Sequence, residues 1–267
     1  MQLFRIWLGH LWQIGILVGA YFAYMYTRAL VFSDFQDTAL ANAQRVIEFE
    51  KDLGFFWEPG WQSWAIDTAK SLVLFFNWAY ITTLWPVMIT AAVILYCTNR
   101  SRYMYYRNIF LISFVIALLG YMLFPLAPPR MITAHFVDTI KVFGPSEYAS
   151  REFANYYNAY AAMPSLHFGW TVMFGIMFLR TNMRWLQVFG VIYPTVTFFA
   201  IVITGNHYIM DAIGGGLLIL ASFFAMEIGI RRRFYITFLY STAHAWFNDT
   251  MSKKAAVRHV EEHNQQN

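Results

Sequence analysis

The sequence predicts an all-α, polytopic membrane protein with six transmembrane helices and an extracytoplasmic amphipathic segment. Of its 267 residues, 58% are hydrophobic and only 13% are charged, whereas an ordinary soluble domain carries about 25% charged residues. The mean hydropathy is +0.42, and six stretches are long and apolar enough, or nearly so, to cross a bilayer. The distribution of Lys and Arg among the segments between them gives these stretches a consistent orientation.

The same composition argues against a soluble globule, a disordered chain and a nucleic-acid-binding protein. The net charge is only +4, and a surface that follows phosphates needs clustered Lys and Arg. The chain has a single cysteine, Cys97, which excludes an intramolecular disulfide and a cysteine-based zinc cluster. We therefore expect a membrane protein without a nucleic-acid partner.

Each expected span has its own pattern of apolar and helix-breaking residues. The first follows Arg5 as a signal peptide would, but its length, its aromatic end and the lack of a small-residue cleavage site favour a retained helix. Pro86 is expected to kink the second span, and the fifth span contains Pro194. The fourth span is short and begins with polar residues. The spans are expected at about 6–26, 71–96, 109–126, 165–179, 185–204 and 208–230.

The positive-inside rule predicts that both termini are cytoplasmic, in a plasma membrane or its equivalent. In this orientation, 12 of the 19 Lys and Arg residues fall on cytoplasmic segments, and such an excess marks the cytoplasmic side. Residues 1–233 would form the membrane-embedded catalytic domain, and residues 234–267 a cytoplasmic tail. The two longer extracytoplasmic segments would be residues 28–70 and 127–164.

Two further features concern how the helices pack. Between Val46 and Trp57, apolar residues alternate with charged ones. This pattern is typical of an amphipathic helix that lies in the membrane interface, and equally of a helix that caps the bundle. The run Gly214–Gly216 is expected to permit close packing of the last span against a neighbour.

Three polar motifs share one predicted location, the extracytoplasmic ends of the spans. They occupy residues 124–130, 163–167 and 204–211, and ionisable residues in or beside membrane helices are costly enough to be functional candidates. His207 and Asp211 are four residues apart and would share one face of a helix. The carboxylate would then bond one imidazole nitrogen and leave the other as a nucleophile or base.

The other two motifs supply groups that bind anions. Ser165 is expected to cap the helix that begins beside His167, so free backbone N–H groups there would point toward an anion. The guanidinium of Arg130 has a fork that suits phosphate. With the histidine–aspartate pair, these residues provide the groups needed for phosphoryl transfer without metal. The pattern alone leaves a metal site and a proton relay open.

The motifs resemble those of a known family. Pro164-Ser-Leu-His167 and His207-Tyr-Ile-Met-Asp211 are similar to the second and third signatures of the type 2 phosphatidic acid phosphatase superfamily, usually Pro-Ser-Gly-His and Ser-Arg-x5-His-x3-Asp. The segment Pro125-Leu-Ala-Pro-Pro-Arg130 resembles the first signature of a branch that contains fungal inositol phosphorylceramide synthase and bacterial relatives. The motifs cover residues 124–216, and the six-span layout extends the resemblance over most of the chain.

This resemblance implies a phosphatase or phosphotransferase that acts on a lipid-linked phosphate through a phosphohistidine, without metal. By motif, His207 would be the nucleophile and Asp211 its orienting partner. His167 would protonate the leaving alcohol and then activate water or a polyol or alcohol acceptor. Ser165 and Arg130 would hold the phosphoryl oxygens.

The sequence departs from the common signatures at positively charged positions. Leu123 stands where the first signature has a Lys, and Ala200 and Ile201 stand where the third has its Ser-Arg pair. Both departures agree with the inositol phosphorylceramide synthase-like branch, but they leave less positive charge for a phosphate. The residues expected to compensate are Asn206, Lys141 and Arg151.

Two functions from other classes compete with the enzyme. One is a proton-coupled transporter in which the histidines and the aspartate form a relay, and the other is a protein that binds lipid headgroups without turnover. Transporters tend to place such residues near the membrane midplane within repeated halves. Here the residues fall at helix ends and no internal repeat is evident, which favours the enzyme.

Overall fold

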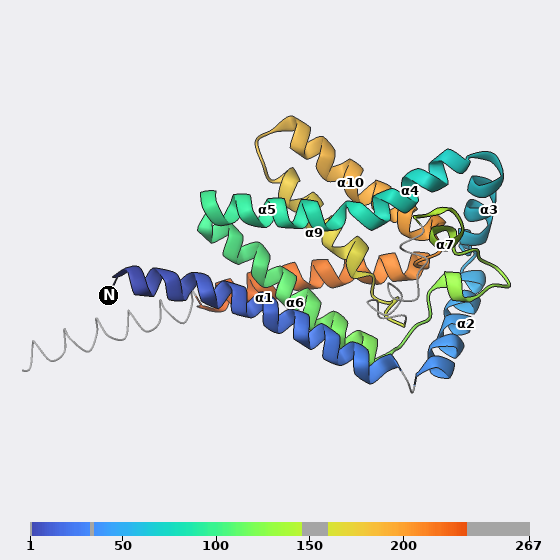
Figure 1. Ribbon diagram of the computed structural model, residues 1–267, viewed down its shortest axis with the longest axis horizontal. Coiled ribbons are helices and arrows are strands. Elements are labelled where there is room, and N and C mark those ends of the chain that lie inside the picture. Colours follow the sequence, from blue (N-terminus) through green and yellow to red (C-terminus); the bar gives the residue numbers. More distant parts are fainter. Residues whose placement is uncertain (1, 33–34, 146–159, 234–267) are drawn as a thin grey trace, which may run out of the picture. The chain divides into compact units, whose positions relative to one another are not determined.

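The computed structural model describes residues 2–32, 35–145 and 160–233, and within these ranges the chain is helical (Figure 1). One short 3₁₀ helix, η1 (Pro129–Met131), and one parallel bridge between Leu126 and Ala161 interrupt the α-helices there. The all-α prediction is confirmed. The helices are α1 (Gln2–Phe32), α2 (Gln36–Asp52), α3 (Glu58–Thr68), α4 (Lys70–Thr82), α5 (Leu84–Thr98), α6 (Arg100–Leu123), α7 (Thr139–Phe143), α9 (Leu166–Leu179), α10 (Arg184–Ile203) and a last helix, Ile209–Arg233.

The chain divides into two compact units, Met1–Ser222 and Phe223–Asn267. The first unit contains all three polar motifs. The last helix begins in the first unit and continues into the second. The expected cytoplasmic tail, residues 234–267, lies outside the described residues.

Several helices are long and apolar enough to cross a membrane, which supports a membrane protein. They are α6, α10 and the last helix, and the bent pair α4–α5 is a fourth if it counts as one span. Helix α9 is apolar but has only 14 residues, fewer than the roughly 20 that a perpendicular span needs. The count of six spans and their orientation remain predictions.

The interruption expected from Pro86 is confirmed. Helices α4 and α5 meet at Thr83 with a bend of 41°. Because proline lacks an N–H and its ring crowds the carbonyl four residues earlier, Pro86 weakens the helix at Thr82. Helix α10, in contrast, continues through Pro194. Helix α6 begins nine residues before the expected span, because the side chain of Asn99 caps it by accepting from the Arg102 N–H at 3.0 Å.

Helix α2 packs against the bundle, in agreement with the second of the two roles expected for the amphipathic segment, and an interfacial position stays a prediction. Its buried stripe includes Ala39, Ala43 and Ile47. The Asn42 side chain donates to the Pro125 carbonyl at 2.8 Å, and the carbonyl of Ala39 accepts the Ala127 N–H at 3.1 Å. This packing ties α2 to the first polar motif. The stripe packs against Leu126, Ala127, Phe136, Tyr160, Ala162 and Tyr208.

Glycine lets α9 and the last helix touch through their backbones. A Cβ on Gly215 would overlap the carbonyl of Ser165, and a Cβ on Gly169 would lie 2.8 Å from the Gly215 carbonyl oxygen. The close packing expected from the glycine run is therefore confirmed at Gly215. It brings the start of α9, with its Ser165 cap, against the first turns of the last helix.

Candidate active site

The structure brings the three polar motifs together in one cluster. The Arg130 N–H donates to the carbonyl of Gly205 at 2.7 Å, which joins the first motif to the third. The Ser165 N–H donates to the Asp211 carbonyl at 3.0 Å, which joins the second motif to the third. In Figure 1, α2, α3 and α7 gather at this end of the first unit.

His207 is held by one of its two ring nitrogens. Nδ1 lies 2.9 Å from the carbonyl oxygen of Ala162 and 3.3 Å from Oδ2 of Asp211. Because a carbonyl can only accept a hydrogen bond, this network assigns the proton to Nδ1. Nε2 then carries a free lone pair, which is the state that a nucleophile or general base requires.

Asp211 is fully buried and bonds two groups at once. Its Oδ2 faces the His207 imidazole and also accepts the backbone N–H of Tyr208 at 2.9 Å. The carboxylate therefore caps the start of the last helix, where the helix dipole favours negative charge. This second bond fixes the carboxylate, which in turn fixes the plane of the imidazole.

The second motif starts α9 in the way that the sequence predicts. Ser165 is the N-cap, and its Oγ accepts the Phe168 N–H at 3.3 Å. Two residues on, the His167 ring stacks on Tyr80 of α4 with centroids 4.4 Å apart. Its Nε2 is buried and has no hydrogen-bond partner among the described residues. The bond from the Ser165 N–H to the Asp211 carbonyl joins the end of α9 that carries His167 to the segment that carries His207 and Asp211.

Arg130 is fixed by polar neighbours but keeps part of its surface. Its Nη1 donates to Oδ1 of Asn206 at 2.6 Å, and its Nε lies 4.0 Å from Oδ2 of Asp138. Its side chain remains 22% exposed, so a further anion has access to it. Asn206 also donates to Oγ1 of Thr204 at 2.7 Å. The structure thus places Asn206 as a support for Arg130, while direct phosphate binding by Asn206 remains a prediction.

A profile of the PAP2 superfamily matches residues 44–225. This match covers most of the chain and includes every residue of the cluster. The chain belongs to the PAP2 superfamily. Membership indicates a function of the phosphatase or phosphotransferase type, and with the apolar helices it indicates a lipid phosphate as the substrate class. No curated protein and no solved structure matches the chain.

The two other residues expected to supply positive charge to this PAP2 site do not enter the described cluster. The side chain of Lys141 is exposed on α7, and its backbone N–H donates to Asp138 Oδ1 at 3.0 Å. Arg151 lies outside the described residues. Among the described residues, no group of three or more His, Cys, Asp or Glu side chains is arranged to hold a metal ion.

Sequence reasoning missed four residues of the candidate site or its immediate support. Tyr80 and Asp138 come from segments far from the motifs, and nothing local in the sequence marks them. Glu50 and Glu58 are both fully buried, and the sequence analysis does not single them out. The sequence pattern could have predicted the burial of Glu50, because this residue continues the buried stripe of α2 at helical spacing after Ala43 and Ile47.

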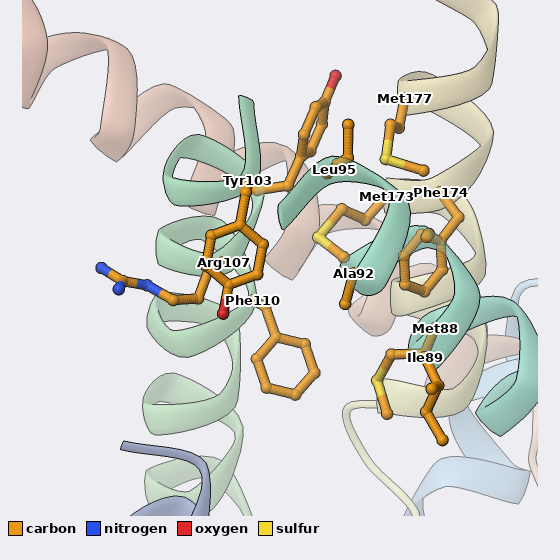
Figure 2. Close-up of a pocket in the computed structure, with 12 residues that line it drawn as sticks. Met88, Ile89, Ala92, Leu95, Tyr103, Arg107, Phe110, Met173, Phe174 and Met177 are labelled. Carbon is orange, nitrogen blue, oxygen red and sulfur yellow. The ribbon is translucent and has the colours of Figure 1, made fainter. Parts of the chain in front are cut away.

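A cavity of about 160 Å³ lies away from this site, between α5, α6 and α9 (Figure 2). Its lining is almost entirely apolar and includes Met88, Phe110 and Met173. Figure 2 shows the guanidinium of Arg107 pointing away from the other labelled side chains, and it donates to Oε1 of Gln13 at 2.6 Å. The lining of the cavity includes none of the histidines or acidic residues of the motif cluster, nor Arg130.

The contact between Asn206 and Arg130 gives a testable prediction. Asn206→Ala removes the acceptor that fixes the guanidinium, and we expect kcat/KM for a lipid phosphate to fall about tenfold, the effect of losing one charge-assisted hydrogen bond. Arg130→Ala should cost more, and the double variant should be no worse than Arg130→Ala. Lys141→Ala is the control. Steady-state kinetics that show equal rates for Asn206→Ala and wild type would remove Asn206 from the site.

Proposed function

We propose that this protein is an integral membrane, metal-independent lipid phosphatase or phosphotransferase that works through a phosphohistidine at His207. The observation that carries the proposal is the bonding of His207 Nδ1 to the Ala162 carbonyl and Asp211, which leaves the Nε2 lone pair free. Family membership supports the reaction class, and the apolar helices support a substrate that resides in a membrane.

The first half-reaction transfers the phosphoryl group to the protein. The Nε2 lone pair of His207 forms a bond to phosphorus as the bond from phosphorus to the ester oxygen breaks. His167 donates a proton to the departing alkoxide, which leaves as a neutral alcohol. Arg130 and the Ser165 end of α9 would offset the charge on the phosphoryl oxygens. Asp211 stabilises the charge that develops on the imidazole.

The second half-reaction returns the protein to its starting state. His167, now neutral, accepts a proton from water or an alcohol. The resulting oxygen nucleophile forms a bond to phosphorus while the bond from Nε2 to phosphorus breaks. His207 keeps its Nδ1 proton throughout, and His167 ends protonated, so the cycle closes without a metal or cofactor.

Transfer to an alcohol is the second candidate for this half-reaction. The absence of two expected cations, at Leu123 and Ile201, agrees with the inositol phosphorylceramide synthase-like branch. That likeness favours a polyol or alcohol acceptor and a phospho-headgroup as the transferred unit. We place the reaction at the extracytoplasmic face, since the excess of Lys and Arg predicts that the motif ends of the helices lie opposite the cytoplasm.

The proposal is tested by following phosphate from a panel of substrates. Purified full-length protein in detergent micelles is given phosphatidic acid and isoprenoid phosphates, with and without inositol, glycerol or a ceramide acceptor. We expect turnover of at least one lipid phosphate, with no loss in EDTA. Free phosphate in the products indicates hydrolysis, and a labelled acceptor indicates transfer. Folded protein that turns over none of these, or only with an added metal ion, would refute the proposal.

A further inference from the structure

Two buried glutamates accept hydrogen bonds from the backbone two and three residues after the proposed nucleophile, His207. Glu50 is in the last turn of α2 and Glu58 is the first residue of α3, and both have an exposed fraction of 0%. Oε1 of Glu50 accepts the N–H of Met210, and Oε1 of Glu58 accepts the N–H of Ile209, each at 2.9 Å. A carboxyl group is rarely buried so completely without a specific role in binding or charge pairing.

These bonds complete a set of three around the start of the last helix. Asp211 accepts the N–H of Tyr208, so three consecutive N–H groups, from residues 208 to 210, each donate to a different carboxyl side chain. The first N–H groups of a helix have no partner within the helix and need such acceptors. His207 immediately precedes them, so its backbone is set by the same three bonds.

The burial of both carboxyl groups beside neighbouring N–H groups favours a shared proton between the two glutamates. Oε2 of each is buried and has no hydrogen-bond partner among the described residues, and the two carboxyl groups interact with each other. An ionised carboxylate can only accept, so a bond between the two carboxyls needs one of them to be protonated. Burial and the neighbouring Glu58 raise the pKa of Glu50 to about 9, which favours Glu50 as the carrier of the proton at neutral pH.

We propose that Glu50 and Glu58 form a proton-sharing acid pair that positions the nucleophile by clamping the start of the helix that carries Asp211. The proposal rests on the proposed function, since positioning matters only if His207 reacts. Neither glutamate touches the reacting atoms, so both are positioning residues. Three titratable groups interact with Glu50. They are Glu58 of α3, Asp211 of the last helix, and Tyr208, the residue just before that helix. All of these are acidic, so a second negative charge in the pair would be strongly opposed.

Two substitutions of Glu50 separate the clamp from mere packing. In Glu50→Gln, the carbonyl oxygen still accepts the Met210 N–H, and the amide N–H₂ replaces the shared proton as donor to Glu58. We expect kcat close to that of wild type. Glu50→Leu keeps the apolar volume but loses both bonds, and we expect kcat to fall at least about tenfold with little change in KM, because the loss is in the geometry of the reacting group. Glu48→Gln, on the exposed side of α2, is the matched control and should leave kcat unchanged.

The shared proton is tested without any substrate, so that its failure is distinct from failure of the proposed function. Infrared spectra at neutral pH should show the carbonyl band of a buried protonated carboxylic acid in wild type, and the band should be absent in Glu50→Gln/Glu58→Gln. Because the pKa of Glu50 is raised, its proton stabilises the fold fully below about pH 4.5. This stabilisation is lost as the pH rises through about 9. Thermal unfolding should therefore show wild type losing stability relative to Glu50→Gln across this window.

The kinetic measurements test the positioning role, and the infrared and stability measurements test the shared proton. Rescue of kcat by Glu50→Gln but not by Glu50→Leu, with the carboxylic acid band in wild type, supports the pair. A wild-type spectrum without that band, or a constant difference in stability between wild type and Glu50→Gln from about pH 5 to 9, would overturn the shared proton. An unchanged kcat in folded Glu50→Leu would overturn the positioning role, whatever substrate the protein uses.

Discussion

His207→Ala is expected to abolish turnover of lipid phosphate, lowering kcat by about 10⁴-fold or more, the size of loss seen when a covalent nucleophile is removed. The reason is that Nε2 is the only lone pair of this imidazole left free by the bonds of Nδ1 to Ala162 and Asp211. Initial rates in detergent micelles, with the substrate that the panel identifies, give the measurement. His207→Gln should behave in the same way, and it retains an amide that can donate to the buried carbonyl.

A matched histidine provides the control for this prediction. His135 is exposed and packs edge-on against Phe56, so His135→Ala should retain the wild-type rate. Thermal unfolding of each variant separates lost chemistry from lost structure. A protein that only binds lipid headgroups would keep its binding in His207→Ala and would show no turnover to lose. Turnover at the wild-type rate in His207→Ala or His207→Gln would rule out the mechanism.

His167→Asn is expected to lower kcat by about 10²- to 10⁴-fold, the usual contribution of general acid–base catalysis. His167 must be protonated to assist the leaving alcohol, so the wild-type rate should fall as the pH rises above the pKa of that acid. His207 must keep a free lone pair, so the rate should also fall in acid. Wild type should thus give a bell-shaped profile of kcat against pH, and His167→Asn should lose the alkaline limb.

The leaving group decides whether His167 acts as an acid. An aryl phosphate releases an oxyanion that needs little protonation, so the first half-reaction of His167→Asn should recover with it. A lipid phosphate releases an alkoxide and should not recover. The test compares the release of the alcohol in a single turnover, before the second half-reaction, from p-nitrophenyl phosphate and from an alkyl phosphate in both proteins. Equal losses for the two substrates would mean that His167 supports the site structurally through its stack on Tyr80.

The sequence predicts much of the fold because the controlling features are local. Apolar stretches locate α6, α10 and the last helix, and Pro86 locates the break before α5. Other boundaries depend on single caps that composition does not reveal, such as Asn99 at the start of α6. The capping role of α2 could not be separated from an interfacial one, because both need the same amphipathic pattern and differ only in what covers the apolar stripe.

In the candidate site, too, the contacts between residues close in sequence could be predicted, and those between distant residues could not. The pairing of His207 with Asp211 and the cap at Ser165 both follow from short spacings in the sequence, and both are present in the structure, although His207 lies just before the last helix and not within it. The fixing of Arg130 by Asn206 joins residues 76 positions apart. The glutamate pair depends on how α2 and α3 meet the last helix. The bond from Met210 to Glu50 of α2 spans 160 positions, and the bond from Ile209 to Glu58 of α3 spans 151. Such long-range contacts carry no periodic signal in the sequence.

The most direct test of the account is to trap the intermediate on His207. His167→Asn is mixed with an aryl phosphate carrying labelled phosphorus, quenched in alkali, and digested for mass spectrometry. We predict a phosphoryl group on the peptide that contains His207, stable in base and lost in acid, as a bond from imidazole nitrogen to phosphorus requires. The same label should be absent from His207→Ala. Turnover without any labelled His207 peptide, or a label that survives in His207→Ala, would contradict the account.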